Sequence, residues 1–125
     1  MGNAKSQLKL VLEVDNKTRH NFKLTHERNI IDHFYLFFKP KKPISFKTIK
    51  YFNISIIKNK NIIDGHKINL NKLDKQLTNI VNGKVMHIYT YQIDGIDINF
   101  KINDKGCLYE ISYTSIANSN PALTS

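Results

Sequence analysis

The dipeptide Asp94-Gly95 constrains the fold of this chain more than any other feature of the sequence. It lies between two runs in which apolar and polar residues alternate, 87–93 and 96–102. Asp-Gly between such runs is typical of a two-residue β-hairpin turn, because both residues tolerate a positive φ. Continuing that register predicts one apolar face built from three cross-strand pairs, namely Ile93–Ile96, Tyr91–Ile98 and Tyr89–Phe100.

Other alternating runs extend this antiparallel pattern. A turn over 103–106 leads into 107–114, where the apolar positions are Cys107, Tyr109, Ile111 and Tyr113. Residues 7–14 also alternate, and after a turn at 15–18 the chain returns through 19–24. The sequence therefore predicts an N-terminal hairpin and a C-terminal three-stranded meander.

Two segments favour helices. In 25–38, Thr25 can cap the first turn and apolar residues recur at helical spacing until Lys39-Pro40 ends the pattern. In 70–82, an apolar stripe runs along one helical face and Asn82-Gly83 provides a stop. Two helices over one sheet would bury both apolar stripes.

The segment 44–63 allows two interpretations. Its many isoleucines and its alternation favour strands at about 44–48 and 51–57. It can also be read as two short helices broken at Asn53-Ile54-Ser55, the outline of a helix-turn-helix.

For the chain as a whole we expect an α+β fold: a single small domain over 1–114, with two helices packed on a mainly antiparallel sheet, followed by a flexible tail over 115–125.

The composition excludes several classes of protein. No apolar run approaches the length that spans a bilayer, and the N-terminus lacks the layout of a secretory signal. The lone Cys107 cannot form an internal disulfide, and its place in the strand pattern indicates a buried, inert thiol. We therefore expect an intracellular protein.

The positive charge is concentrated in the first half of the chain. The net charge is +9, and residues 1–62 carry 13 Lys and Arg against 4 acids, whereas residues 63–125 carry six of each. Between Lys39 and Lys60 there is no acid at all, and this segment holds Lys39, Lys41, Lys42, Lys47, Lys50, Lys58 and Lys60. Such a localised positive field attracts phosphate, and Tyr51 among these lysines is a candidate for stacking on a base.

The first residues suggest a second possibility. Gly2 after the initiator methionine, with Ser6 four residues later, matches the pattern for N-myristoylation. A single myristoyl chain binds membranes only weakly and needs a polybasic partner, which the Lys39–Lys60 segment would provide. This reading predicts a peripheral protein on an anionic membrane surface, of the viral matrix or accessory type.

The sequence gives no support for catalysis. The histidines are dispersed and lack metal-ligand spacing, no carboxylate pair is evident, and the glycines are too scattered for a phosphate loop.

We expect a small, non-enzymatic, basic binding protein with no cofactor and no metal. Its expected partner is RNA or single-stranded nucleic acid, as in a component of a ribonucleoprotein particle, and contacts through lysine would read little sequence because arginine is scarce. Besides the membrane reading, the alternative is a virus- or mobile-element-encoded inhibitor that blocks a protein target.

Overall fold

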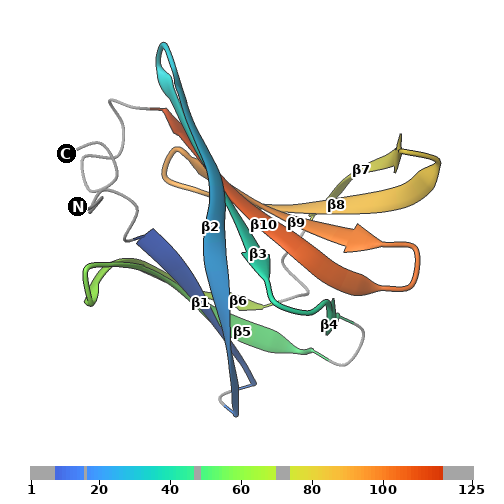
Figure 1. The fold of residues 1–125 in the computed structure, drawn as a ribbon, viewed down its shortest axis with the longest axis horizontal. Coiled ribbons are helices and arrows are strands. Elements are labelled where there is room, and N and C mark those ends of the chain that lie inside the picture. The colour runs from blue at the N-terminus through green and yellow to red at the C-terminus, as the bar shows by residue number, and fades with distance from the viewer. Residues whose placement is uncertain (1–7, 16, 47–48, 70–73, 117–125) are drawn as a thin grey trace.

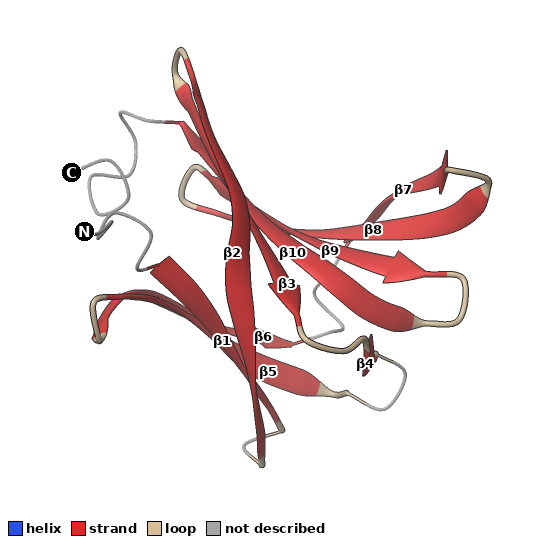
Figure 2. Cartoon of the chain, in the orientation of Figure 1, coloured by secondary structure: helices blue, strands red, loops and turns tan. Residues whose placement is uncertain are grey.

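In the part of the chain that the structure describes, ten strands form one antiparallel sheet and no helix occurs (Figure 2). The structure is a computed structural model, and it describes residues 8–15, 17–46, 49–69 and 74–116. The strands are β1 (Leu8–Val14), β2 (Thr18–Ile30), β3 (His33–Pro40), β4 (Ile44–Ser45), β5 (Tyr51–Lys58), β6 (Asn61–Asn69), β7 (Asp74–Val81), β8 (Lys84–Ile93), β9 (Ile96–Asn103) and β10 (Cys107–Ile116).

The sheet curls into a half-barrel (Figure 1). Its strand order is β6-β5-β1-β2-β3-β10-β9-β8-β7, and the short β4 pairs with β10 beside this path. Four strands separate β5 from β9 in that order, yet the ring centroids of Phe52 and Phe100 are only 5.2 Å apart. The inner face of the sheet therefore packs against itself across the interior.

Alternate residues of these strands form the core. Thirteen-residue β2 contributes little to it, because most of its length is exposed. The cluster of buried apolar side chains comprises Leu10, Leu12, Phe22, Leu36, Phe38, Ile49, Phe52, Ile54, Ile56, Ile68, Ile96, Ile98, Phe100, Ile102, Leu108, Ile111 and Tyr113. We call the opposite face of the sheet the outer face.

The hairpin predicted at Asp94-Gly95 is confirmed. Both turn residues have positive φ, 45° and 80°. The register has the three predicted pairs, Ile93–Ile96, Tyr91–Ile98 and Tyr89–Phe100. The N-terminal hairpin is also present as β1 and β2, so the strand pairing at both ends of the chain follows from local sequence.

The helix predicted over 25–38 is wrong, because this segment forms the end of β2, a turn and β3. In β3 the side chains alternate: Leu36 and Phe38 are buried, whereas Tyr35 and Phe37 lie on the outer face. The unbroken apolar run over 34–38 fits a helical stripe and a two-sided strand equally well, and its aromatic residues favour the strand.

The helix predicted over 70–82 is also wrong for its described residues. Residues 74–81 form β7, which pairs with β8, and 70–73 lie outside the described residues. Asn82 and Gly83 have φ of 52° and 78°, which are the positive values of a two-residue hairpin turn. The predicted α+β class is therefore replaced by an all-β fold, since both proposed helices are strands.

The central segment follows the strand interpretation. Residues 44–45 form β4, and 51–58 form β5, so the helix-turn-helix outline is wrong.

The last strand, β10, continues through Ser115 and Ile116, and Ser115 is buried; residues 117–125 lie outside the described residues. A bulge between Leu108 and Glu110 shifts the alternation of β10, so Leu108 rather than Cys107 is buried.

Asp15 holds the turn after β1 against the start of β5. Its carboxylate Oδ1 accepts hydrogen bonds from the backbone N–H groups of Lys50 (3.3 Å) and Tyr51 (3.2 Å), and its φ is 50°. Asp15→Ala should lower the free energy of unfolding by about 1–3 kcal/mol, because two backbone donors lose their acceptor and alanine disfavours this φ. Urea unfolding measures this loss, and Asp15→Asn, which retains an acceptor and tolerates the conformation, should restore most of it.

Tyr113 should make the free energy of unfolding depend on pH in the alkaline range. Its hydroxyl is buried with no hydrogen-bond partner among the described residues, and burial, with a smaller contribution from the Asp64 carboxylate, raises its pKa well above 10.0. Above pH 10 the tyrosine of the unfolded chain loses its proton while the buried one keeps it, so the free energy of unfolding falls as pH rises. Tyr113→Phe should fold with equal or greater stability at pH 7 and should show a shallower alkaline decline in urea titrations. A steeper decline in the variant would contradict this assignment.

Candidate nucleic-acid interface

Three lysines lie side by side on the outer face of adjacent strands. The register places Lys9 of β1 opposite Lys23 of β2, and Lys23 opposite Lys39 of β3. All three are exposed. Neighbouring strands lie ~4.8 Å apart, so these ammonium groups, which we call the lysine row, can reach the same anion. Like charges directly opposite one another destabilise a sheet, so the row is an arrangement that folding alone does not favour.

Within the described part of the chain, no ion pair involves the lysine row. Among the described residues, the ion pairs are those of His66 with Asp64 (3.0 Å) and of Lys101 with Glu110 (2.6 Å), and neither includes a member of the row. The row and Lys41 line a cavity of about 380 Å³, and no Asp or Glu occurs among the described residues of its walls. This region of the outer face is therefore concave and positively charged, and such a surface raises the local concentration of anions.

A row of aromatic rings continues from the lysine row along β3. His33, Tyr35 and Phe37 alternate with the core residues, so all three rings lie on the outer face. The centroids of Tyr35 and Phe37 are 6.5 Å apart with an angle of 5° between ring planes, and those of His33 and Tyr35 are 6.1 Å apart at 25°. We call these three residues the aromatic ladder. Lys39 is the next outward residue of the same strand, so rings and charge form one continuous surface.

A β-bulge determines which residues of β2 face the ladder. The register shifts between Leu24 and His26, and the hydroxyl of Thr25 donates a hydrogen bond to the carbonyl oxygen of Phe37 (3.2 Å). Beyond the bulge, His26 lies opposite Phe37, with 5.7 Å between ring centroids. The next outward pair joins Arg28 to Tyr35. Without the extra residue Glu27 would take the place of Arg28, so the bulge gives this face a cation in place of an acid.

The other side of the ladder contacts β9. The Lys101 ammonium lies 5.6 Å from the centroid of the Phe37 ring and is also paired with Glu110. The ammonium lies over the face of the Phe37 ring, and the pairing with Glu110 largely compensates the charge of Lys101. Lys101 therefore supports the ring rather than adding to the free positive charge of the surface.

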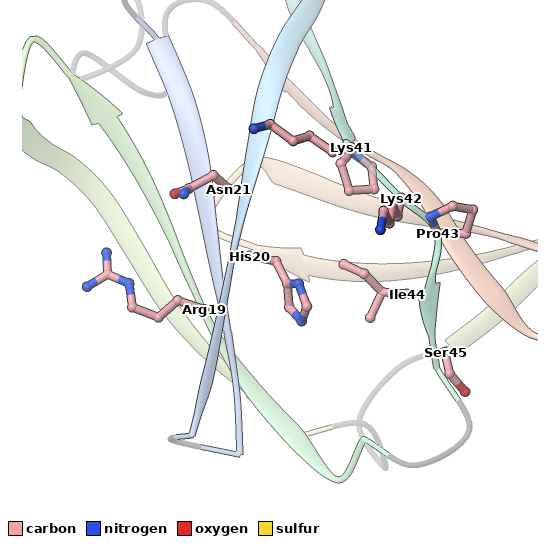
Figure 3. Close-up of a pocket in the computed structure, with 9 residues that line it drawn as sticks. Arg19, His20, Asn21, Lys41, Lys42, Pro43, Ile44 and Ser45 are labelled. Atoms are coloured by element: carbon pink, nitrogen blue, oxygen red, sulfur yellow. The ribbon is translucent and has the colours of Figure 1, made fainter.

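The sheet splits where β3 ends, and the gap forms a second cavity. Pro40 lacks an N–H group and is the last residue of β3 to pair with β2, opposite Phe22. The chain then crosses to β4, which pairs with β10. The resulting notch, of about 540 Å³, lies between β2 and residues 40–45 (Figure 3). Its lining residues are Arg19, His20, Asn21, Pro40, Lys41, Lys42, Pro43, Ile44 and Ser45.

The lysines predicted from the sequence fall into two groups. Lys39, Lys41 and Lys42 belong to the surface described above, and Lys60 lines a further cavity of about 580 Å³ together with Lys9 of the lysine row. Lys58 is exposed at the same end of β5. Lys50 lies at the opposite end of β5, where its backbone contacts Asp15.

The remaining predicted residues lie elsewhere. Tyr51 is half-buried on β5, three strands away from β3, and the Lys67 ammonium lies 5.1 Å from the centroid of its ring. Lys47 and Gly2 lie outside the described residues.

Sequence reasoning missed several residues of this surface. Lys9 and Lys23 were available from the N-terminal hairpin, because the pairing of β1 with β2 sets them opposite each other. Tyr35 and Phe37 were assigned to a helix, so their common outward face was not recognised. Arg19 joins Lys42 at the notch only because β3 leaves β2 at Pro40, and no local pattern contains that information.

The described residues were also compared with the requirements of a metal site and of a membrane-spanning helix. These residues include no group of three or more His, Cys, Asp or Glu that could hold a metal ion. They also include no helix with the length and hydropathy needed to cross a membrane. Comparison with protein-family models, curated proteins and solved structures finds no match for this chain.

Proposed function

We propose that this protein is a non-enzymatic binding protein for RNA or another single-stranded nucleic acid, which it contacts through the outer face of β1, β2 and β3. The observation that carries the proposal is the continuity of the lysine row with the aromatic ladder on one face of the sheet. Proteins that bind single strands combine a positively charged groove for phosphates with aromatic rings on which bases stack. Here Lys39 directly follows the ladder along β3, so both kinds of contact lie on one path.

The chemistry of the surface favours single strands over duplexes. Tyr35 and Phe37 present their rings from a sheet, and only unpaired bases can leave their own stack to meet them. Apart from Arg28 beside Tyr35, the cations that continue from the ladder are those of the lysine row, which act on phosphate as point charges and do not distinguish bases. Binding should therefore depend strongly on salt and weakly on sequence.

Fluorescence anisotropy with labelled oligonucleotides tests the proposal. We expect single-stranded RNA and DNA to bind at least about tenfold more tightly than a duplex of the same sequence, since each stacked base contributes about 1–3 kcal/mol. Equal affinity for duplex and single strand would show that charge alone is responsible and would contradict the role of the ladder. Binding to vesicles rich in anionic lipid, with no binding to any oligonucleotide, would favour the membrane partner instead.

A further inference from the structure

We propose that the notch between β2 and residues 40–45 binds the terminal phosphate of the nucleic-acid strand that lies on the outer face. The inference rests on the proposed function and adds a specificity to it: the protein would prefer strands that end in a phosphate monoester. Its basis is the composition of the notch, its position at the end of the lysine row, and the free edge of β2 within it.

The lining of the notch suits a phosphate group. Among the residues that the structure describes, the charged ones in its lining are Arg19, Lys41 and Lys42, with no Asp or Glu. A phosphate monoester carries about −1.5 to −2 charges near neutral pH and three acceptor oxygens, whereas each diester within a strand carries one charge. The Arg19 side chain extends from β2 away from residues 40–45 (Figure 3), so Lys41 and Lys42 supply the positive charge on that side of the notch. A doubly charged monoester matches two cations better than a singly charged diester does, which favours the end of a strand over its interior.

The backbone of β2 adds further donors. Residues 18–21 pair with β1 on one side, while β3 has already ended at Pro40 on the other. Alternate N–H groups along this stretch therefore point into the notch, and backbone N–H groups commonly bind phosphate oxygens. His20 also faces this space from β2, and its ring points toward Ile44 across the gap (Figure 3).

The notch is continuous with the surface that would bind the strand. Asn21, Pro40 and Lys41 line both the notch and the cavity beside the lysine row. A strand that passes along the ladder and over Lys39 reaches the notch at the point where β3 leaves the sheet. The volume of about 540 Å³ lies within the range of small-ligand sites and accommodates one nucleotide.

The test compares three versions of one labelled single-stranded oligonucleotide, with a 5′-phosphate, with a 3′-phosphate, or with hydroxyls at both ends. One of the phosphorylated forms should bind about tenfold more tightly than the hydroxyl form, as expected for one charge-assisted contact. The variant Arg19→Gln/Lys42→Gln removes charges that line the notch but not the neighbouring cavity, and it should abolish this preference. The matched control Lys84→Gln/Lys105→Gln, at exposed lysines of β8 and the β9–β10 turn, should retain it.

The outcomes separate this inference from the proposed function. Tight binding of all three oligonucleotides with equal affinity would overturn the terminal-phosphate site and leave the single-strand interface in place. Retention of the preference in Arg19→Gln/Lys42→Gln would place the phosphate elsewhere and would also overturn the inference. If no oligonucleotide binds, the proposed function fails, and the inference, which depends on it, fails with it.

Discussion

Replacing Tyr35 and Phe37 together by alanine should weaken the binding of a single-stranded oligonucleotide by at least about thirtyfold. Loss of a ring that stacks on a base costs about 1–3 kcal/mol, so two rings account for about 2 kcal/mol at the lower limit. Both rings lie on the outer face and are only partly buried, so the core of the sheet remains intact. Anisotropy titrations measure the affinity, and Tyr35→Phe should bind like the wild-type protein because the ring is retained.

Tyr51→Ala is the matched control for this experiment. Tyr51 is also a partly buried tyrosine on the outer face, but it lies on β5 against Lys67, outside the aromatic ladder. Loss of binding in Tyr51→Ala together with normal binding in the Tyr35 and Phe37 double variant would move the stacking site to β5. Urea unfolding of each variant separates loss of binding from loss of the fold.

Replacing Lys9, Lys23 and Lys39 together by glutamine should change binding and stability in opposite directions. If each lysine contacts one phosphate, the log–log salt dependence of binding should become shallower by about 2, at ~0.7 for each contact with a single strand. The same relation implies about a hundredfold weaker binding at 0.1 M salt. The free energy of unfolding should rise, because the register gives two like-charged neighbour pairs, each costing about 0.2–1 kcal/mol.

A purely structural role for these lysines would not produce this combination. The control variant carries Lys50→Gln, Lys84→Gln and Lys105→Gln, which removes the same charge from exposed positions outside the lysine row. It should show a smaller change of salt slope and no gain in stability. An unchanged slope in the Lys9, Lys23 and Lys39 variant, compared with the wild-type protein, would contradict phosphate contact at the row.

Local sequence was sufficient to predict strand pairing where a turn and its flanking strands indicate the same register. Asp94-Gly95 determines both the turn and the register of β8 and β9, because the two-residue loop leaves one way to pair the alternating runs. The same is true of the hairpin of β1 and β2, and that register already contained two of the three members of the lysine row. The concentration of positive charge in the first half of the chain was likewise evident from the sequence.

Tertiary structure decided what local periodicity left open. The aromatic run of β3 fits a helix or a strand, and it becomes a strand because its neighbours β2 and β10 satisfy its backbone hydrogen bonds and the core accepts alternate side chains. The bulge at Thr25 then determines that Arg28, and not Glu27, lies beside Tyr35, since a shift of one residue reverses every face of a strand. The sequence by itself therefore determined the hairpins and the charge of the chain. The order of strands in the sheet determined which charges and rings share a surface, because that surface joins strands through pairings that no local pattern specifies.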